Sequence, residues 1–134
     1  MKTVFADTNV ILDVLLKNEG FWEDSLKIIR LAESGEIRVC VSASSMTDIF
    51  YVARKKLSIP VARAAIENLL SLFEIVGVDG DDLRGALTLP IGDMEDSLQV
   101  WCAKKSGSEM LITRNVKDFQ NIGMPVIAPS EFSA

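Results

Sequence analysis

The chain contains no histidine, and this limits the chemistry that an active site in it could use. Histidine is the base of Ser-His-Asp and Cys-His sites and a common zinc ligand. A site in this chain must therefore use carboxylates, hydroxyls, amines or a hard cation. Four carboxylates are the best-placed candidates, at Asp7, Asp48, Asp96 and Asp118.

Each of the four aspartates lies next to an element of an expected α/β fold. Asp7 directly follows a short β-prone run, and Asp118 lies just beyond the expected strand 110–113. Asp48 and Asp96 fall in the first turns of two expected helices. In an open parallel sheet, ligands bind beyond the carboxyl ends of the strands, where the following loops and helix N-termini meet. We therefore expect all four carboxylates at one edge, with their repulsion offset by a cation or by shared protons.

Each of these acids also has an ordinary structural explanation. Asp93 can cap the helix that contains Asp96, and acids in a first turn are favoured by the exposed amides and the helix dipole. The same explanation applies to Asp48, and Asp118 could be an ordinary turn residue. For Asp7, helix capping and a functional role are equally good explanations. The functional case depends on convergence of the four. The remaining acids of note are expected to face solvent or to cap helices, and they are Asp13, Asp24, Asp79, Asp81, Asp82 and Glu95.

The apolar pattern predicts strands and helices that alternate along the chain. Short β-prone runs predict strands at 3–6, 38–41, 75–78, 110–113 and 125–128. Helical spacing and cap residues predict helices at 10–16, 21–34, 46–56, 58–73, 79–87 and 93–105, with a short helical piece at 115–121. This alternation is typical of a parallel sheet covered on both faces. We expect an α/β fold with three layers, α/β/α, and a central parallel sheet of four to five strands.

The length and composition predict one domain over residues 1–134. A chain of 134 residues, 49% of them hydrophobic, can bury one core but is short for two. No run approaches the roughly 20 apolar residues that span a bilayer, and Asp7 interrupts the apolar N-terminal run, so we expect a cytoplasmic protein without a membrane partner. Cys40 and Cys102 match no metal or redox spacing, so we expect buried free thiols.

The net charge of −5 is unfavourable for a protein that binds a polyanion. Basic residues nevertheless form local groups, although the first two suit a solvated helix face better than a binding surface. These groups are Arg54–Lys56, Lys104 with Lys105, and Arg114 with Lys117. Because Arg114 and Lys117 are nearest to the proposed centre, they are candidates for phosphate contacts, with an exposed turn cation as an equal alternative.

Several segments, taken together, resemble the PIN domain family, and most closely its VapC-type bacterial toxin nucleases. Their order and spacing along the chain carry the resemblance. The segments are Asp7-Thr8-Asn9, Ser45–Asp48, Asp93–Leu98, Thr113–Phe119 and the closing Pro125–Phe132. One position departs from the pattern, because many relatives carry glutamate where this chain has Asp48.

The resemblance implies a PIN-like fold and a metal-dependent endoribonuclease that hydrolyses RNA phosphodiesters, as the toxin of a type II toxin-antitoxin pair. It implies that the four aspartates hold one or two Mg²⁺ or Mn²⁺ ions, which suits an oxygen-only donor set. Asn9 and Asn115 match the family's supporting polar positions. The implied partners are RNA, a small antitoxin and a second copy of the chain. Apolar residues available for such interfaces, if they are not part of the core, are Phe21, Trp22, Phe50 and Tyr51.

Two alternatives remain at this stage. One is a PIN-domain nuclease that is not a toxin. The other is a non-catalytic, Mg²⁺-binding regulatory domain similar to a phospho-acceptor receiver. Receivers need paired acids early in the chain and a lysine after the last strands, whereas here Asp7 stands alone and Lys2 precedes the first strand. The sequence therefore favours the nuclease.

Overall fold

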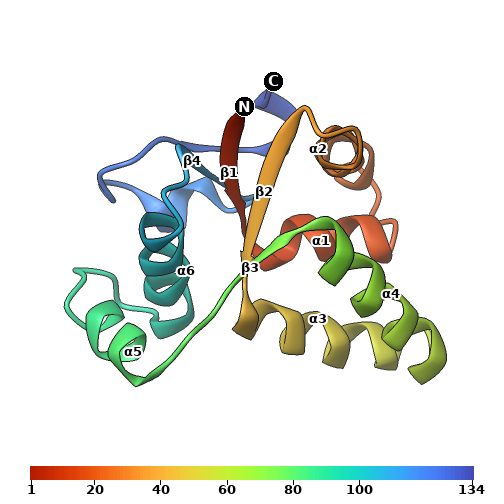
Figure 1. Ribbon diagram of the computed structural model, residues 1–134, viewed down its shortest axis with the longest axis horizontal. Coiled ribbons are helices and arrows are strands. Elements are labelled where there is room, and N and C mark those ends of the chain that lie inside the picture. The colour runs from red at the N-terminus through yellow and green to blue at the C-terminus, as the bar shows by residue number, and fades with distance from the viewer.

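A sheet of five parallel strands lies between two groups of helices in the computed structural model, which describes residues 1–134 (Figure 1). The strands are β1 (Lys2–Ala6), β2 (Ile37–Ser42), β3 (Glu74–Val76), β4 (Met110–Ile112) and β5 (Val126–Ile127). Their order across the sheet is β3-β2-β1-β4-β5, and every neighbouring pair is parallel. The predicted α/β fold with a central parallel sheet is confirmed.

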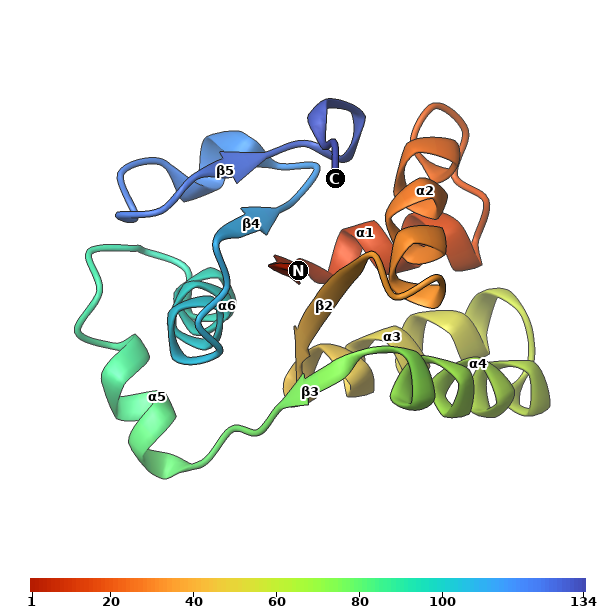
Figure 2. The ribbon, with the colours of Figure 1, turned by 45° about the horizontal axis from the view of Figure 1, so that its top comes forward.

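Helices cover both faces of this sheet, as the two ribbon views show (Figures 1 and 2). The helices are α1 (Thr8–Leu15), α2 (Trp22–Glu33), α3 (Ala43–Lys56), α4 (Ile59–Leu72), α5 (Gly80–Ala86) and α6 (Met94–Lys105), with 3₁₀ turns η1 (Val116–Phe119) and η2 (Pro129–Glu131). Helices α1 to α4 lie on one side, and α5 and α6 on the other. The three-layer arrangement follows. None of the helices has the length and apolar character required to cross a bilayer.

The strands are buried on both faces, and their side chains alternate between two cores. Val4 and Ala6 of β1 pack with α1 to α4, whereas Phe5 packs with α6. In β2, Val41 belongs to the first core and Cys40 to the second. Strands covered on both faces read as continuous apolar runs, and this is why their positions could be predicted from the sequence.

The strand order reverses at β1, and this creates the place where a site can form. From β1 the chain moves outward through β2 and β3, and it later returns to add β4 and β5 on the other side. Ligands of open α/β sheets bind beyond the strand ends at such a switch point. The backbone N–H of Asp7 donates to the carbonyl of Ile112 at 2.9 Å, so the residues that follow β1 and β4 start side by side.

Helix α3 begins earlier than predicted. The sequence predicts a start near Met46 with a cap at Ser44 or Ser45. In the structure Ser42 is the cap: its hydroxyl accepts from the Ser45 N–H at 3.1 Å, and α3 begins at Ala43. Ser42, Ser44 and Ser45 are all suitable caps, and the end of β2 at Ser42 selects the first of them. As a consequence, Asp48 lies in the second turn of α3 and not in the first.

Helix α6 does not have the single apolar face that the sequence suggested. Its buried residues include Leu98, Val100 and Ala103, which surround most of the helix. The sheet covers one side of α6 and α5 covers another, where Gly85 lies directly against the Trp101 ring. Both cysteines are buried and free.

Candidate active site

Three of the four predicted carboxylates line one cleft at the carboxyl edge of the sheet. The cleft has a volume of about 590 Å³, and its walls come mainly from residues 7–12 of α1 and its cap, 44–52 of α3 and 94–99 of α6. The acids on its walls are Asp7, Asp48, Asp96 and also Glu95. The predicted supporting residues Asn9 and Asn115 line the same cleft.

Asp7 is the most firmly held of these acids, with a side chain that is only 8% exposed. Its Oδ1 accepts from the Thr8 N–H at 2.8 Å and from Gln99 Nε2 at 2.9 Å. Its Oδ2 accepts from Thr113 Oγ1 at 2.8 Å and, more weakly, from Asn9 Nδ2 at 3.4 Å. The bond from the Thr8 N–H caps α1. Asp7 therefore caps a helix and also presents a fixed carboxylate at the cleft.

A buried hydroxyl and amide network behind Asp7 was not predicted. Gln99 is 5% exposed, and its Oε1 accepts from Ser42 Oγ at 2.9 Å. Thr8 Oγ1 donates to Ser45 Oγ at 2.8 Å, and Ser45 Oγ lies 2.9 Å from Ser42 Oγ. This network joins the end of β2 to α1, α3 and α6 beneath the cleft. The available signal was Gln99 itself, a polar residue one helical turn after Asp96.

Asp96 is placed as the sequence predicted, in the first turn of α6, and the Asp93 carboxylate caps this helix by accepting from the Asp96 N–H at 3.0 Å. Partial burial, followed by the negative charges of Asp93, Asp7 and Asp118, raises the pKa of Asp96 to about 6. The carboxylates are therefore close enough to disfavour one another's charge.

The remaining two acids are less enclosed. Asp48 is exposed on the α3 wall of the cleft. Asp118 is exposed in η1 and does not line the cleft, although its charge acts on Asp96. The four carboxylates were expected to meet at one edge of the sheet, and three of them share the cleft. Asp118 does not, because the loop after β4 contributes Asn115 to the cleft and then turns into η1, which contains Asp118.

The donor set fits Mg²⁺ or Mn²⁺ in its chemistry, since every candidate ligand is an oxygen. No three acidic or cysteine side chains lie close enough together to hold an ion by themselves. This arrangement suits Mg²⁺, which is usually bound through one or two carboxylates while waters and substrate phosphate complete its shell. It does not suit a closed, all-protein cage.

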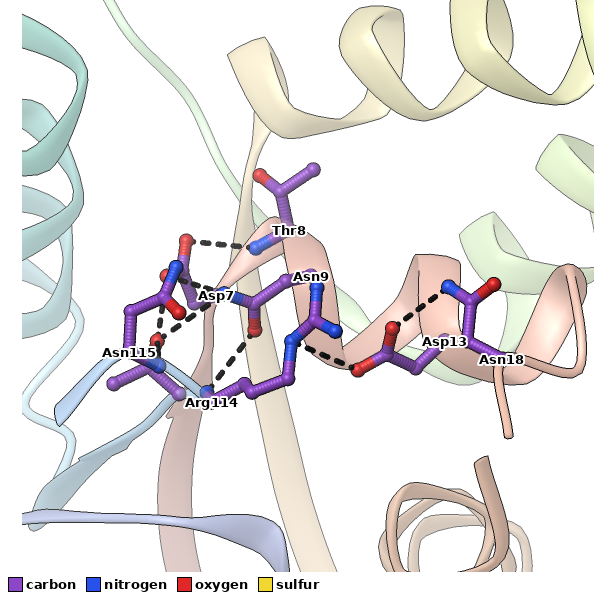
Figure 3. Close-up of polar contacts among 8 residues, drawn as sticks. Asp7, Thr8, Asn9, Asp13, Asn18, Arg114 and Asn115 are labelled. Atoms are coloured by element: carbon purple, nitrogen blue, oxygen red, sulfur yellow. Dashed lines mark hydrogen bonds and ion pairs between the residues drawn. The ribbon is translucent and has the colours of Figure 1, made fainter. Parts of the chain in front are cut away.

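Of the two predicted phosphate contacts, only Lys117 has a side chain free of protein partners. Arg114 Nε lies 3.5 Å from Asp13 Oδ2, and its guanidinium carbon lies 4.4 Å from the centre of the Phe21 ring. Figure 3 shows the Arg114 side chain turned along α1 toward Asp13 and away from Asp7.

The expectation that Asp13 faces solvent or caps a helix is wrong, because its side chain is 1% exposed in the second turn of α1. Asp82 is also buried, although it does take part in a helix cap: its Oδ2 accepts from the Asp79 N–H at 3.0 Å. In both cases a distant basic residue, Arg114 or Lys105, pairs with the acid and allows its burial.

Fold and site together define an α/β protein with an acidic cleft at the switch point of its parallel sheet. A PIN domain family model matches residues 3–117 of the 134. Since this match covers most of the chain, the chain belongs to the PIN domain family.

Similar proteins span almost the same length. The chain is 28% identical to ribonuclease VapC1 of Aquifex aeolicus (strain VF5), over 96% of this chain and 92% of that protein. Its fold is similar to that of DNA-bound VapBC from Salmonella typhimurium, with a TM-score of 0.71, 22% identity, and 96% and 99% of the two chains covered. A toxin-antitoxin complex from Klebsiella pneumoniae is similar with a TM-score of 0.69, 23% identity and the same coverage.

Proposed function

We propose that this protein is a single-domain, metal-dependent endoribonuclease that hydrolyses RNA phosphodiesters, and that it is the toxin of a toxin-antitoxin pair. The observation that carries the proposal is the cleft at the switch point of a PIN domain, which is lined by the carboxylate that follows β1 and by carboxylates of α3 and α6. Similarity to a ribonuclease over nearly the full length of both proteins supports the choice of RNA.

In this proposal, Asp7 and Asp96 hold Mg²⁺ or Mn²⁺, while Asp48 and Asp118 complete the acidic group or orient waters. The chemistry that a bound ion supplies is polarisation of the phosphodiester and activation of a water for in-line attack. Asp7 presents a fixed carboxylate because Gln99 and Thr113 orient it. Asn9 and Asn115 support the acids from the same cleft.

The acidic cleft needs positive charge to admit an RNA phosphate. Lys117 is exposed one residue before Asp118 and is the nearest cation without an ion-pair partner in its motif. We assign phosphate contact to Lys117 and not to Arg114, because the Arg114 side chain is engaged with Asp13 and Phe21.

An antitoxin partner is supported by the similarity to chains from toxin-antitoxin complexes. A homodimer is the second proposed assembly. Of the four aromatic residues suggested for interfaces, Tyr51 and Phe21 are the exposed ones, at 57% and 44%, and Trp22 and Phe50 are half-buried. Tyr51 also lines the cleft, so an interface there would border the site. The cytoplasmic location stays a prediction.

Two other functions were open from the sequence. A receiver-like domain is not supported, because the chain belongs to the PIN domain family. A PIN-domain nuclease that is not a toxin would use the same cleft, and it would differ only in having no antitoxin and no growth effect.

The test is to incubate the purified protein with total cellular RNA in Mg²⁺, in Mn²⁺ or in a chelator. We expect a discrete set of fragments with metal and intact RNA with the chelator. Inhibition of growth on induction, relieved by the product of an adjacent gene, would support the toxin role. Fragmentation that continues undiminished in the chelator would contradict the metal-dependent mechanism.

A further inference from the structure

Asp13 is a buried charge that the proposed mechanism does not use. Its side chain is 1% exposed, and its Oδ1 accepts from Asn18 Nδ2 at 2.8 Å. Its Oδ2 has no hydrogen-bond partner, and the cation beside it is Arg114, with Nε at 3.5 Å. A carboxylate withdrawn from water is costly unless a charge compensates it, so Asp13 constrains where Arg114 must lie.

Arg114 is held from a second side by Phe21. Its guanidinium carbon lies 4.4 Å from the centre of that ring, a distance at which a cation is attracted to the aromatic face. The Arg114 side chain is only 35% exposed, so most of its surface is in contact with protein. Arg114 thus links the loop after β4 to α1 and to the residue that precedes α2.

The backbone of this loop leads directly to Asp7. The Arg114 N–H donates to Asn9 Oδ1 at 3.2 Å, and the Asn115 N–H donates to Thr113 Oγ1 at 3.1 Å. Thr113 Oγ1 in turn donates to Asp7 Oδ2 at 2.8 Å. Figure 3 shows how Arg114 lies between Asn9, next to Asp7, and Asp13 farther along α1.

We propose that Asp13, Arg114 and Phe21 form a clamp that positions the loop after β4 against α1, and thereby fixes Thr113 and Asn115 relative to Asp7. Arg114 is then a positioning residue and not a contact for substrate phosphate. The consequence for metal binding and cleavage rests on the proposed function, whereas the effect on the loop does not.

The experiment compares the wild type with Arg114→Ala, Asp13→Asn and the double variant. The double variant is included because Arg114→Ala alone leaves a buried charge unpaired and can unfold the chain, whereas Asp13→Asn in the same chain removes that charge. Arg63→Ala is the matched control, since it deletes an exposed arginine of α4 that makes no ion pair.

Two readouts are taken for each folded variant: hydrogen exchange of the amides of residues 113–118 without metal, and Mn²⁺ affinity by calorimetry without RNA. We expect faster exchange at 113–118 in the clamp variants and not in the control. We expect Mn²⁺ affinity to fall about 10-fold, as it does when residues that orient metal ligands are lost. The Mn²⁺ affinity of the double variant should be no lower than that of the single variant with the lower affinity.

Kinetics separate the clamp from a phosphate contact. The clamp predicts an unchanged KM for RNA and a lower kcat that recovers at high Mn²⁺, with partial rescue by Arg114→Lys. Unchanged exchange, or a raised KM with unchanged Mn²⁺ affinity, would overturn the clamp. If the wild type neither binds Mn²⁺ nor cuts RNA, the proposed function fails, and hydrogen exchange still decides on the clamp.

Discussion

Asp7 and Asp82 are both buried aspartates with several hydrogen-bond donors, but the donors differ in charge. Asp82 accepts from Lys105 Nζ at 2.8 Å and from Trp101 Nε1 at 3.0 Å. The hydrogen bonds from Lys105, then the Asp79 backbone and then Trp101, hold the pKa of Asp82 well below its usual range. The hydrogen bond to Asp82 in turn raises the pKa of Lys105. The negative charge there is already balanced inside the protein.

Asp7 receives hydrogen bonds from an amide, a hydroxyl and backbone, and none from a cation. No lysine or arginine lies within ion-pair distance of it. It also faces a cleft that contains Asp96, whereas Asp82 closes the contact between α5 and α6. An acid that is oriented but not neutralised can bind a cation, and an acid that is paired with lysine stabilises the fold.

The largest expected effect separates these two acids directly. Asp7→Asn should lower metal-dependent RNA cleavage by at least about 100-fold, the upper range for loss of groups that support a metal site, and should leave the protein folded. Asp82→Asn should lower the melting temperature and leave cleavage at low temperature near the wild-type rate. Cleavage rates and thermal unfolding of both variants check this. Equal loss of activity in the two would remove the distinction.

Gly85→Ala tests the Asp82 side of the comparison without changing a charge. A Cβ at position 85 would overlap the Trp101 ring, and that ring is held by its hydrogen bond to Asp82. Overpacking of this kind costs about 1–3 kcal/mol of unfolding free energy. Urea unfolding would measure the loss, and cleavage by the folded variant should be retained. A variant as stable as the wild type would show that α5 can move away from α6 freely.

Gln99→Met tests the Asp7 side in the same way, by removing a neutral donor while keeping the side-chain volume. Asp7 Oδ1 would lose its bond from Gln99 Nε2, and Ser42 Oγ would lose its acceptor. We expect Mn²⁺ affinity to fall about 10-fold. Calorimetry with Mn²⁺ measures this. An unchanged affinity would mean that Thr113 and Thr8 hold Asp7 sufficiently.

The comparison also explains what could be predicted from sequence. Strand positions and the first-turn place of Asp96 follow from local rules, namely apolar runs and helix capping, and they were predicted. The burial of Asp13 and Asp82 depends on Arg114 and Lys105, which lie far along the chain. No local pattern distinguishes an acid with such a partner from one that faces solvent. The importance of Gln99 could not be predicted for the same reason, because its partners, Asp7 and Ser42, also lie far along the chain.

The smallest expected effect concerns Asp96, whose side chain is crowded by other acids and has no ion-pair partner. Its folded-state pKa of about 6 is above the ordinary value of 3.8. The folded protein therefore binds this proton more tightly than the unfolded chain, and metal-free stability should fall as the pH rises from about 4 to about 6. The Asp96→Asn variant has no ionisable group at this position, so its stability should not fall with pH for this reason.

Urea unfolding of the wild type and Asp96→Asn in chelator, at pH 4 and pH 7.5, checks the sign. Between these values, the wild type should lose about 1 kcal/mol relative to the variant, a figure reduced for the partial exposure of the carboxylate. Adding Mn²⁺ at pH 7.5 should stabilise the wild type and have little effect on the variant, because the ion offsets the repulsion that the substitution has already removed. If Mn²⁺ stabilises both proteins equally, then Asp96 does not hold the ion and Asp7 must bind it without this partner.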